Sequence, residues 1–466
     1  MFELHPLVIL AIGILTVLGM IIVLRVHAFL SLITAAIVVS LLAPGGLAEK
    51  ISRVAEAFGT TAGKIGIVIA LAAVIGRCLI ESGAADRIVR LFVGLLGEKR
   101  CAISLMSSGF VLSIPVFFDT VFYLLLPLAR SMHRRTNKSY LLLILAMGAG
   151  ASITHSLVPP TPGPLIIAET LGIDLGMMIL VGLLVAIPTS IVMLFFVGWL
   201  AGRVEIPMRS LEGGRPEPEP LPDEQLPALL PSFLPIILPV LMISTHTIVS
   251  TLAQGAEVDS GIMRVRSFTA VLGNANLAML VSAAIAMYVL WQKRKPGREG
   301  LARMVESSLM SGGVIILITS AGGAFGAMLK AAEIGPAIQN IMVADGGAHI
   351  GGLKLLFMGF FIAFLIKFAQ GSSTVAMITA SAMLAGLITS PEEIGFHPVY
   401  LAAAIGFGSQ CGNWMNDSGF WIFAKMSGLT EVETLKTWTV TISILAFVGL
   451  LFTVLFAKIL PLTSYV

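Results

Sequence analysis

The sequence predicts an all-α polytopic membrane protein made of two inverted-topology repeats, and three observations support this. Of the 466 residues, 57% are hydrophobic and 12% are charged, whereas soluble domains carry about 25% charged residues. Apolar runs of bilayer-spanning length recur along the whole chain. Each half contains the same order of segments: about five spans, with one interrupted run that returns on itself and one broken span.

In the first half, the length of the apolar runs identifies the first spans, and the charge of the loops indicates their orientation. Apolar runs of spanning length cover about 6–24, 28–43 and 62–80. Charged residues alternate with apolar ones over 84–97, which predicts a short helix lying in the membrane interface. The loop between the first two runs is basic, so the positive-inside rule places it in the cytoplasm and the N-terminus outside the cell.

The run at about 101–129 is too long for one span and is interrupted at 114–120. Basic residues flank it on both sides, at 99–100 and at 130–138. Because both ends then belong in the cytoplasm, the run is predicted to be a re-entrant hairpin with its tip at 115–120.

The run at about 140–172 contains four prolines and a glycine within 159–164. Proline removes backbone donors and clashes with the preceding turn, so no continuous helix can pass. A break at membrane depth is tolerated only where the freed backbone groups face protein or a water-filled cavity. The segment is therefore a candidate site, and the span at 176–201 then returns to the cytoplasm.

A linker rich in proline and glutamate, 203–230, is predicted to be cytoplasmic and to separate a first repeat, 1–202, from a second, 231–466. The second repeat contains spans, a hairpin entering from outside and a broken helix, in this order: spans at about 231–252, 267–291 and 308–329, the hairpin at about 353–388, the broken helix at about 398–428 and a final span at about 437–460. The C-terminus is then also outside.

Local sequence matches accompany the shared order of segments. Gly148 and Gly150 correspond to Gly406 and Gly408, the GPLIIA run at 163–168 corresponds to GFWIFA at 419–424, and DTV at 119–121 corresponds to STV at 373–375. Each half has an odd number of spans, so the second must be inverted. Interrupted segments at equivalent positions of inverted halves indicate a transporter with a binding site near the membrane midplane.

Three residues at the interruptions are candidates for proton coupling: Asp119, Asp417 and His155. A carboxylate at membrane depth costs about 2.5–3.5 kcal/mol on insertion scales, which indicates a function. Either aspartate can instead cap the helix that begins beside it. His155 titrates near neutrality and can bind substrate or move a proton.

Substrate binding is predicted at the same four interruptions. Half-helices beginning near Pro164 and Gly419 direct positive dipole ends at the midplane, which favours an anion. Lys367 can pair with a substrate carboxylate or extend to the interface. The candidate substrate-binding residues are Thr120, His155, Thr161, Gly163, Lys367, Gln370, Gly371, Ser372, Ser373, Thr374, Asn413, Asn416, Asp417 and Ser418.

Other function classes find no support. The chain has no H-E-x-x-H, G-x-S-x-G or other catalytic spacing, so an enzyme is not expected. Cys78, Cys101 and Cys411 have no metal-binding spacing and are assigned to packing. The net charge of +3 does not indicate nucleic-acid binding. No cofactor or metal is expected.

Four motifs resemble those of the gluconate permease (GntP) family of the Ion Transporter superfamily: IPVFFD at 114–119, HSLVPPTPGP at 155–164, AQGSSTVA at 369–376 and NDSGFW at 416–421. The resemblance implies proton-coupled uptake of gluconate or a related small hydroxylated monocarboxylate across the bacterial inner membrane, by a homodimer that moves elevator-fashion. Many gluconate permeases have histidine where this chain has Thr161, which leaves the substrate open. The alternatives are D-serine or a short hydroxy acid in the same site, or sodium/proton antiport.

Overall fold

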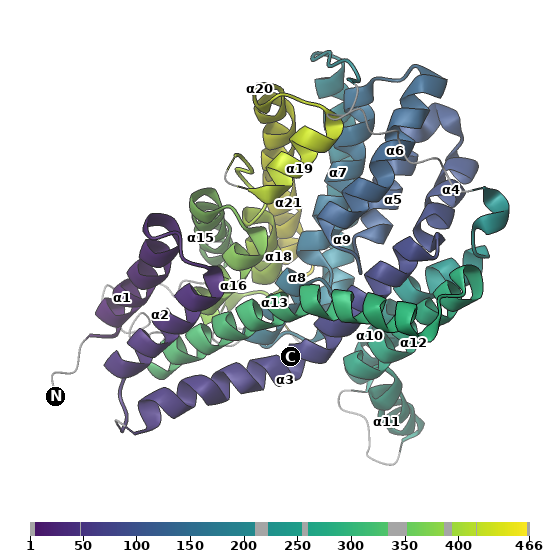
Figure 1. Cartoon of the computed structure of the whole chain (residues 1–466). Coiled ribbons are helices and arrows are strands. Elements are labelled where there is room, and N and C mark those ends of the chain that lie inside the picture. Colours follow the sequence, from purple (N-terminus) through teal and green to yellow (C-terminus); the bar gives the residue numbers. More distant parts are fainter. Residues whose placement is uncertain are drawn as a thin grey trace.

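The computed structural model describes residues 5–46, 48–209, 222–253, 260–333, 352–385, 394–415 and 417–463, and all regular structure in these ranges is helical (Figure 1). Within them, seven stretches are long and apolar enough to cross a membrane: Glu49–Glu81, Tyr140–Thr170, Leu175–Ala201, Leu229–Leu252, Ala275–Arg294, Arg298–Ala331 and Glu431–Ile459. The prediction of an all-α multi-pass membrane protein is confirmed.

The N-terminal helices are α1 (Pro6–Leu18), which continues as a π-helix over Gly19–Val23, then α2 (Ala28–Leu42), α3 (Glu49–Glu81) and α4 (Ala84–Leu96). Helix α3 begins well before the predicted run at 62–80. Its first turn is bonded to the end of α2, where Lys50 Nζ donates to the carbonyl O of Leu41 (2.7 Å). This contact holds the polar start of α3 against the end of α2, so that α3 is longer than its apolar run.

Two helix pairs and two broken helices surround the centre of the molecule. In the first half these are α5 (Cys101–Leu112) with α6 (Phe118–Thr136), and α7 (Tyr140–Leu157) with α8 (Pro162–Thr170). In the second half they are α15 (Leu353–Gln370) with α16 (Ser373–Leu384), and α18 (Val399–Gly408) with α19 (Ser418–Ser427). Helix α6 extends through most of the basic segment at 130–138, which follows the predicted hairpin.

The remaining helices connect and surround these pairs: 3₁₀ turns at Glu98–Arg100 and Asp223–Gln225, α9 (Leu175–Ala201), α10 (Leu229–Leu252), α11 (Gly261–Leu272), α12 (Ala275–Arg294), α13 (Arg298–Ala331), α20 (Glu431–Thr434), a π-helix at Leu435–Thr439 and α21 (Val440–Ile459). The run expected as one span at 267–291 is split at Gly273, because Asn274 caps α12 by accepting from the N–H of Asn276 (3.0 Å).

The long helices α3 and α13 pack along each other and cross the lower part of the view in Figure 1, whereas the interrupted helices gather on one side of this pair. Helix α5 packs on α7, and α15 packs on α18. A Cβ added at Gly150 would collide with the carbonyl O of Met106, and one at Gly408 with the carbonyl O of Phe360. Gly150 and Gly408 are one of the glycine pairs that the sequence comparison of the two halves matched. The inversion of the halves remains a prediction.

Candidate functional site

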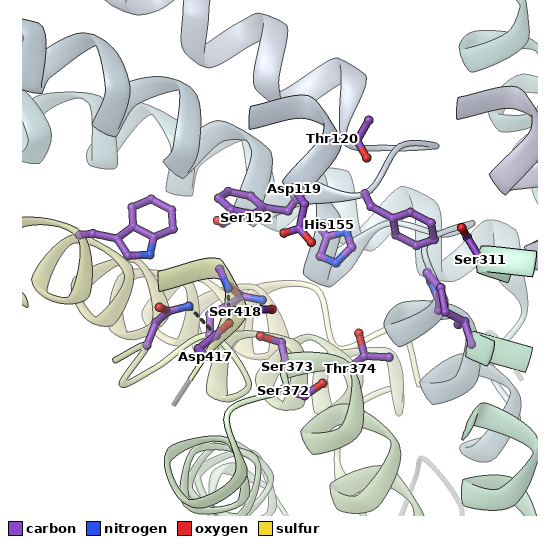
Figure 2. A pocket seen from close by; sticks show the side chains of 18 residues that line it. Asp119, Thr120, Ser152, His155, Ser311, Ser372, Ser373, Thr374, Asp417 and Ser418 are labelled. Carbon is purple, nitrogen blue, oxygen red and sulfur yellow. Dashed lines mark hydrogen bonds between the residues drawn. The ribbon is translucent and has the colours of Figure 1, made fainter. Parts of the chain in front are cut away.

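A cavity of about 350 Å³ lies where the interrupted helices meet (Figure 2). Its walls come from the tip between α5 and α6, the break between α7 and α8, the tip between α15 and α16, and the break between α18 and α19. Helix α13 closes it through Ser311 and Ile315, and Trp438 completes the wall. Segments more than 300 residues apart in the sequence therefore form one site.

Four helices begin at this cavity. The starts of α6, α8, α16 and α19 contribute Phe118, Pro162, Ser373 and Ser418 to its lining. The first N–H groups of a helix have no intrahelical partner and carry the positive end of its dipole. The N-cap side chains of α6 and α8 make no hydrogen bond to these groups. The starts of α6 and α8 therefore direct positive potential at the cavity, whose lining also includes the carboxylates of Asp119 and Asp417.

Asp119 lies in the first turn of α6, is half-buried and lines the cavity. The N-cap of α6 is Phe117, so Asp119 does not cap the helix, and the capping alternative is wrong. Within the described part of the chain, its carboxylate has no hydrogen-bond or ion-pair partner. The side chain is available to a proton or a ligand.

His155 lies in the last turn of α7 and lines the same cavity, with its ring in edge contact with Phe117 at 6.3 Å between centroids. Its Nδ1 atom is buried without a hydrogen-bond partner among the described residues. Figure 2 places it beside Asp119 and Ser152. His155 therefore borders the cavity with a ring whose Nδ1 is buried and unpaired among the described residues.

Asp417 also borders the cavity, but its carboxylate is fully engaged. It caps α19 by accepting from the N–H of Gly419 (2.6 Å), and it accepts from Asn413 Nδ2 (2.7 Å). It forms an ion pair with Lys367, whose side chain is 0% exposed and does not line the cavity. Lys367 therefore does not extend to the membrane interface.

Six other candidate residues line the cavity: Thr120, Ser372, Ser373, Thr374, Asn413 and Ser418. Three do not. Thr161 is buried and donates to the carbonyl O of Val158 (2.8 Å), Gly163 is packed against Met377, and Gly371 ends α15 with φ 87°. Asn416 and the side chain of Gln370 lie outside the described residues.

Sequence reasoning missed several lining residues. Ser152 stands one helical turn before His155, so helix periodicity could have found it. Gln410 lies directly after the C-cap of α18, at the start of the break between α18 and α19. Ser311, Ile315 and Trp438 belong to helices with no interruption at those positions, and no sequence signal places them at the site.

Known proteins resemble this chain over nearly its full length. The sequence profile described as GntP family permease matches residues 5–459. A gluconate permease of Pseudomonas aeruginosa is 31% identical over 465 residues, covering 98% of this chain and 99% of the relative. A low-affinity gluconate transporter of Escherichia coli is 30% identical over 426 residues, covering 91% and 92%. The solved structure of Neisseria gonorrhoeae MtrF, titled as one of a class of antimetabolite efflux pumps, has a TM-score of 0.67 at 15% identity, covering 96% and 98%, and shares the fold.

Proposed function

The chain belongs to the GntP permease family, and from this premise we propose that it takes gluconate or a related small hydroxylated monocarboxylate into the cell together with protons. The protein is a multi-pass membrane permease and not an enzyme. The observation that carries the proposal is the convergence of four helix starts on one cavity, lined by hydroxyl and amide groups together with Asp119, His155 and Asp417.

The composition of the cavity fits a hydroxylated carboxylate. Its volume of about 350 Å³ lies at the small end of the range of ligand pockets. Hydroxyl and amide groups from four interruptions can exchange hydrogen bonds with substrate hydroxyls. Helix N-termini supply the positive potential for the carboxylate, so no lysine or arginine is needed in the lining.

Asp119 is the group we assign to proton coupling. Its carboxylate borders the cavity and has no fixed counter-ion among the described residues, whereas Asp417 is paired with Lys367. An ionised Asp119 would repel the substrate carboxylate, so proton and substrate favour each other's binding. His155 is the second candidate, because it lines the same cavity.

We further propose the arrangement in the membrane. Two inverted repeats, 1–202 and 231–466, are joined by a cytoplasmic linker at 203–230, with both termini outside the bacterial inner membrane. The interrupted helices form a unit that moves elevator-fashion past α3 and α13 in a homodimer. The position of Ser311 of α13 in the cavity lining supports this, because it puts the site at the boundary between the two parts.

The test is uptake of labelled gluconate by proteoliposomes with an inward proton gradient. We expect accumulation above equilibrium that an uncoupler abolishes and that is unchanged when sodium is replaced by choline. Accumulation that requires sodium, or that survives the uncoupler, would contradict proton coupling. Competition by a panel of gluconate, D-serine and short hydroxy acids identifies the substrate, and sodium-driven proton movement without any organic acid would support antiport instead.

A further inference from the structure

Lys367 is a buried cation that transport as described above does not use. It lies in the last turn of α15, and its side chain is 0% exposed. Its Nζ donates a hydrogen bond to the carbonyl O of Gly371 (2.8 Å) and forms an ion pair with Asp417. An ammonium group buried at membrane depth is costly unless it is paired, so this position indicates a specific role.

The two oxygen partners of Lys367 belong to different parts of the site. Gly371 ends α15 at the second hairpin tip, directly before the cavity-lining residues Ser372–Thr374 of the tip. Asp417 caps α19, the second half of the second broken helix. The ammonium group therefore joins the tip to the start of α19.

A second set of contacts also joins the end of α15 to the break between α18 and α19. Trp414 Nε1 donates to the carbonyl O of Phe368 (3.0 Å), and the two rings are stacked with centroids 5.3 Å apart. Gly412 has φ 70°, and a Cβ there would crowd Phe368 and Phe364. The end of α15 is thus fitted closely against the break between α18 and α19, and Lys367 supplies the charged part of this contact.

We propose that Lys367 is a positioning residue that holds the second hairpin tip against the start of α19. Its ammonium occupies, as a tethered cation, the place between the Gly371 carbonyl and the Asp417 carboxylate where a transported metal cation would otherwise bind. This proposal rests on the proposed function, because the site that Lys367 holds in shape is the proposed substrate cavity. It also explains why the cation position beside Asp417 is already filled.

Paired substitutions separate positioning from proton transfer. Lys367→Met leaves the Asp417 carboxylate buried without a cation, which is far more costly than replacing both partners. Adding Asp417→Asn removes that charge and keeps a side chain able to cap α19. We expect gluconate uptake to fall about tenfold or more in the single variant and to recover largely, including uphill accumulation, in the double variant. Exchange without accumulation in the double variant would make the pair the proton carrier and overturn the proposal.

A reporter at the tip gives a readout that needs no substrate. Ser373→Cys places a thiol in the cavity, whereas Cys78, Cys101 and Cys411 are buried. In purified protein, a maleimide should label this thiol faster when Lys367→Met is added and at the original rate when Asp417→Asn is also present. Lys354→Met, at an exposed lysine of the same helix, is the matched control and should leave the rate unchanged. Equal rates with and without Lys367→Met would overturn the proposal.

Chemical rescue tests the tethered-cation part. In Lys367→Ala, the freed space should admit ethylammonium or sodium, and either cation should raise uptake and slow the labelling of the tip. Ethanol is the neutral control for ethylammonium. Absence of any cation effect would remove the claim that a cation position exists there. If the wild-type protein took up no gluconate, the proposed function would fail, while the labelling experiments would still decide the role of Lys367.

Discussion

The two hairpin tips meet at the same cavity but present residues of different charge. The first tip presents Asp119, a carboxylate with no partner among the described residues. The second presents the neutral residues Ser373 and Thr374, and the nearby Asp417 is neutralised by Lys367. The aligned DTV and STV sequences thus place a carboxylate in one half and a hydroxyl in the other.

This difference indicates that the two halves have different roles in transport. A carboxylate that exchanges protons must be free to change charge during the cycle. A carboxylate that caps a helix and pairs with a buried lysine must keep its charge, because losing it would leave the lysine without a partner. We therefore expect the first half to supply the coupling group and the second half to supply a fixed wall.

The largest expected effect is from Asp119→Asn. This side chain cannot release a proton, so proton-driven accumulation of gluconate should be lost while exchange of internal for external substrate continues. The measurement compares uphill uptake with counterflow in the same proteoliposomes. Asp119→Glu is the control and should retain some accumulation. If uphill uptake and exchange were equally active in Asp119→Asn, the carrier would be another group, and His155 would be tested next.

A smaller effect is expected where the two halves are alike. Gly150→Ala and Gly408→Ala each place a methyl group against a facing carbonyl, of Met106 and Phe360 respectively. Overpacking of this kind costs about 1–3 kcal/mol. Both variants should therefore lower the thermal unfolding midpoint in detergent, and the two decreases should be similar. In α9, Gly198 has nothing within 4 Å of an added Cβ, and Gly198→Ala should not destabilise. Destabilisation by only one of the paired variants would weaken the structural equivalence of the halves.

The sequence predicted the interrupted helices because proline, glycine and charged residues inside apolar runs leave few alternatives. It could not decide between roles for Asp417 and Lys367, because their pairing joins residues 50 positions apart whose side chains fit either role alone. Thr161 was a predicted substrate-binding residue, yet its hydroxyl donates to the carbonyl O of Val158 and the residue does not line the cavity. Ser311 entered the site only through packing of α13, which periodicity does not encode.

The smallest expected effect comes from the hydroxyl groups that the two tips present. Thr120→Val and Ser373→Ala each remove one lining hydroxyl. A lost hydrogen bond to substrate costs about 0.5–1.5 kcal/mol, so each should raise the KM for gluconate by about 2- to 10-fold with little change in maximal rate. Thr189→Val is the matched control, because Thr189 donates within α9 to the carbonyl O of Val185 (2.7 Å) and lies off the cavity lining. An increase in KM at only one tip would show that the substrate hydroxyls bind mainly that half of the molecule. If that tip were the second one, coupling and substrate binding would be assigned to different halves.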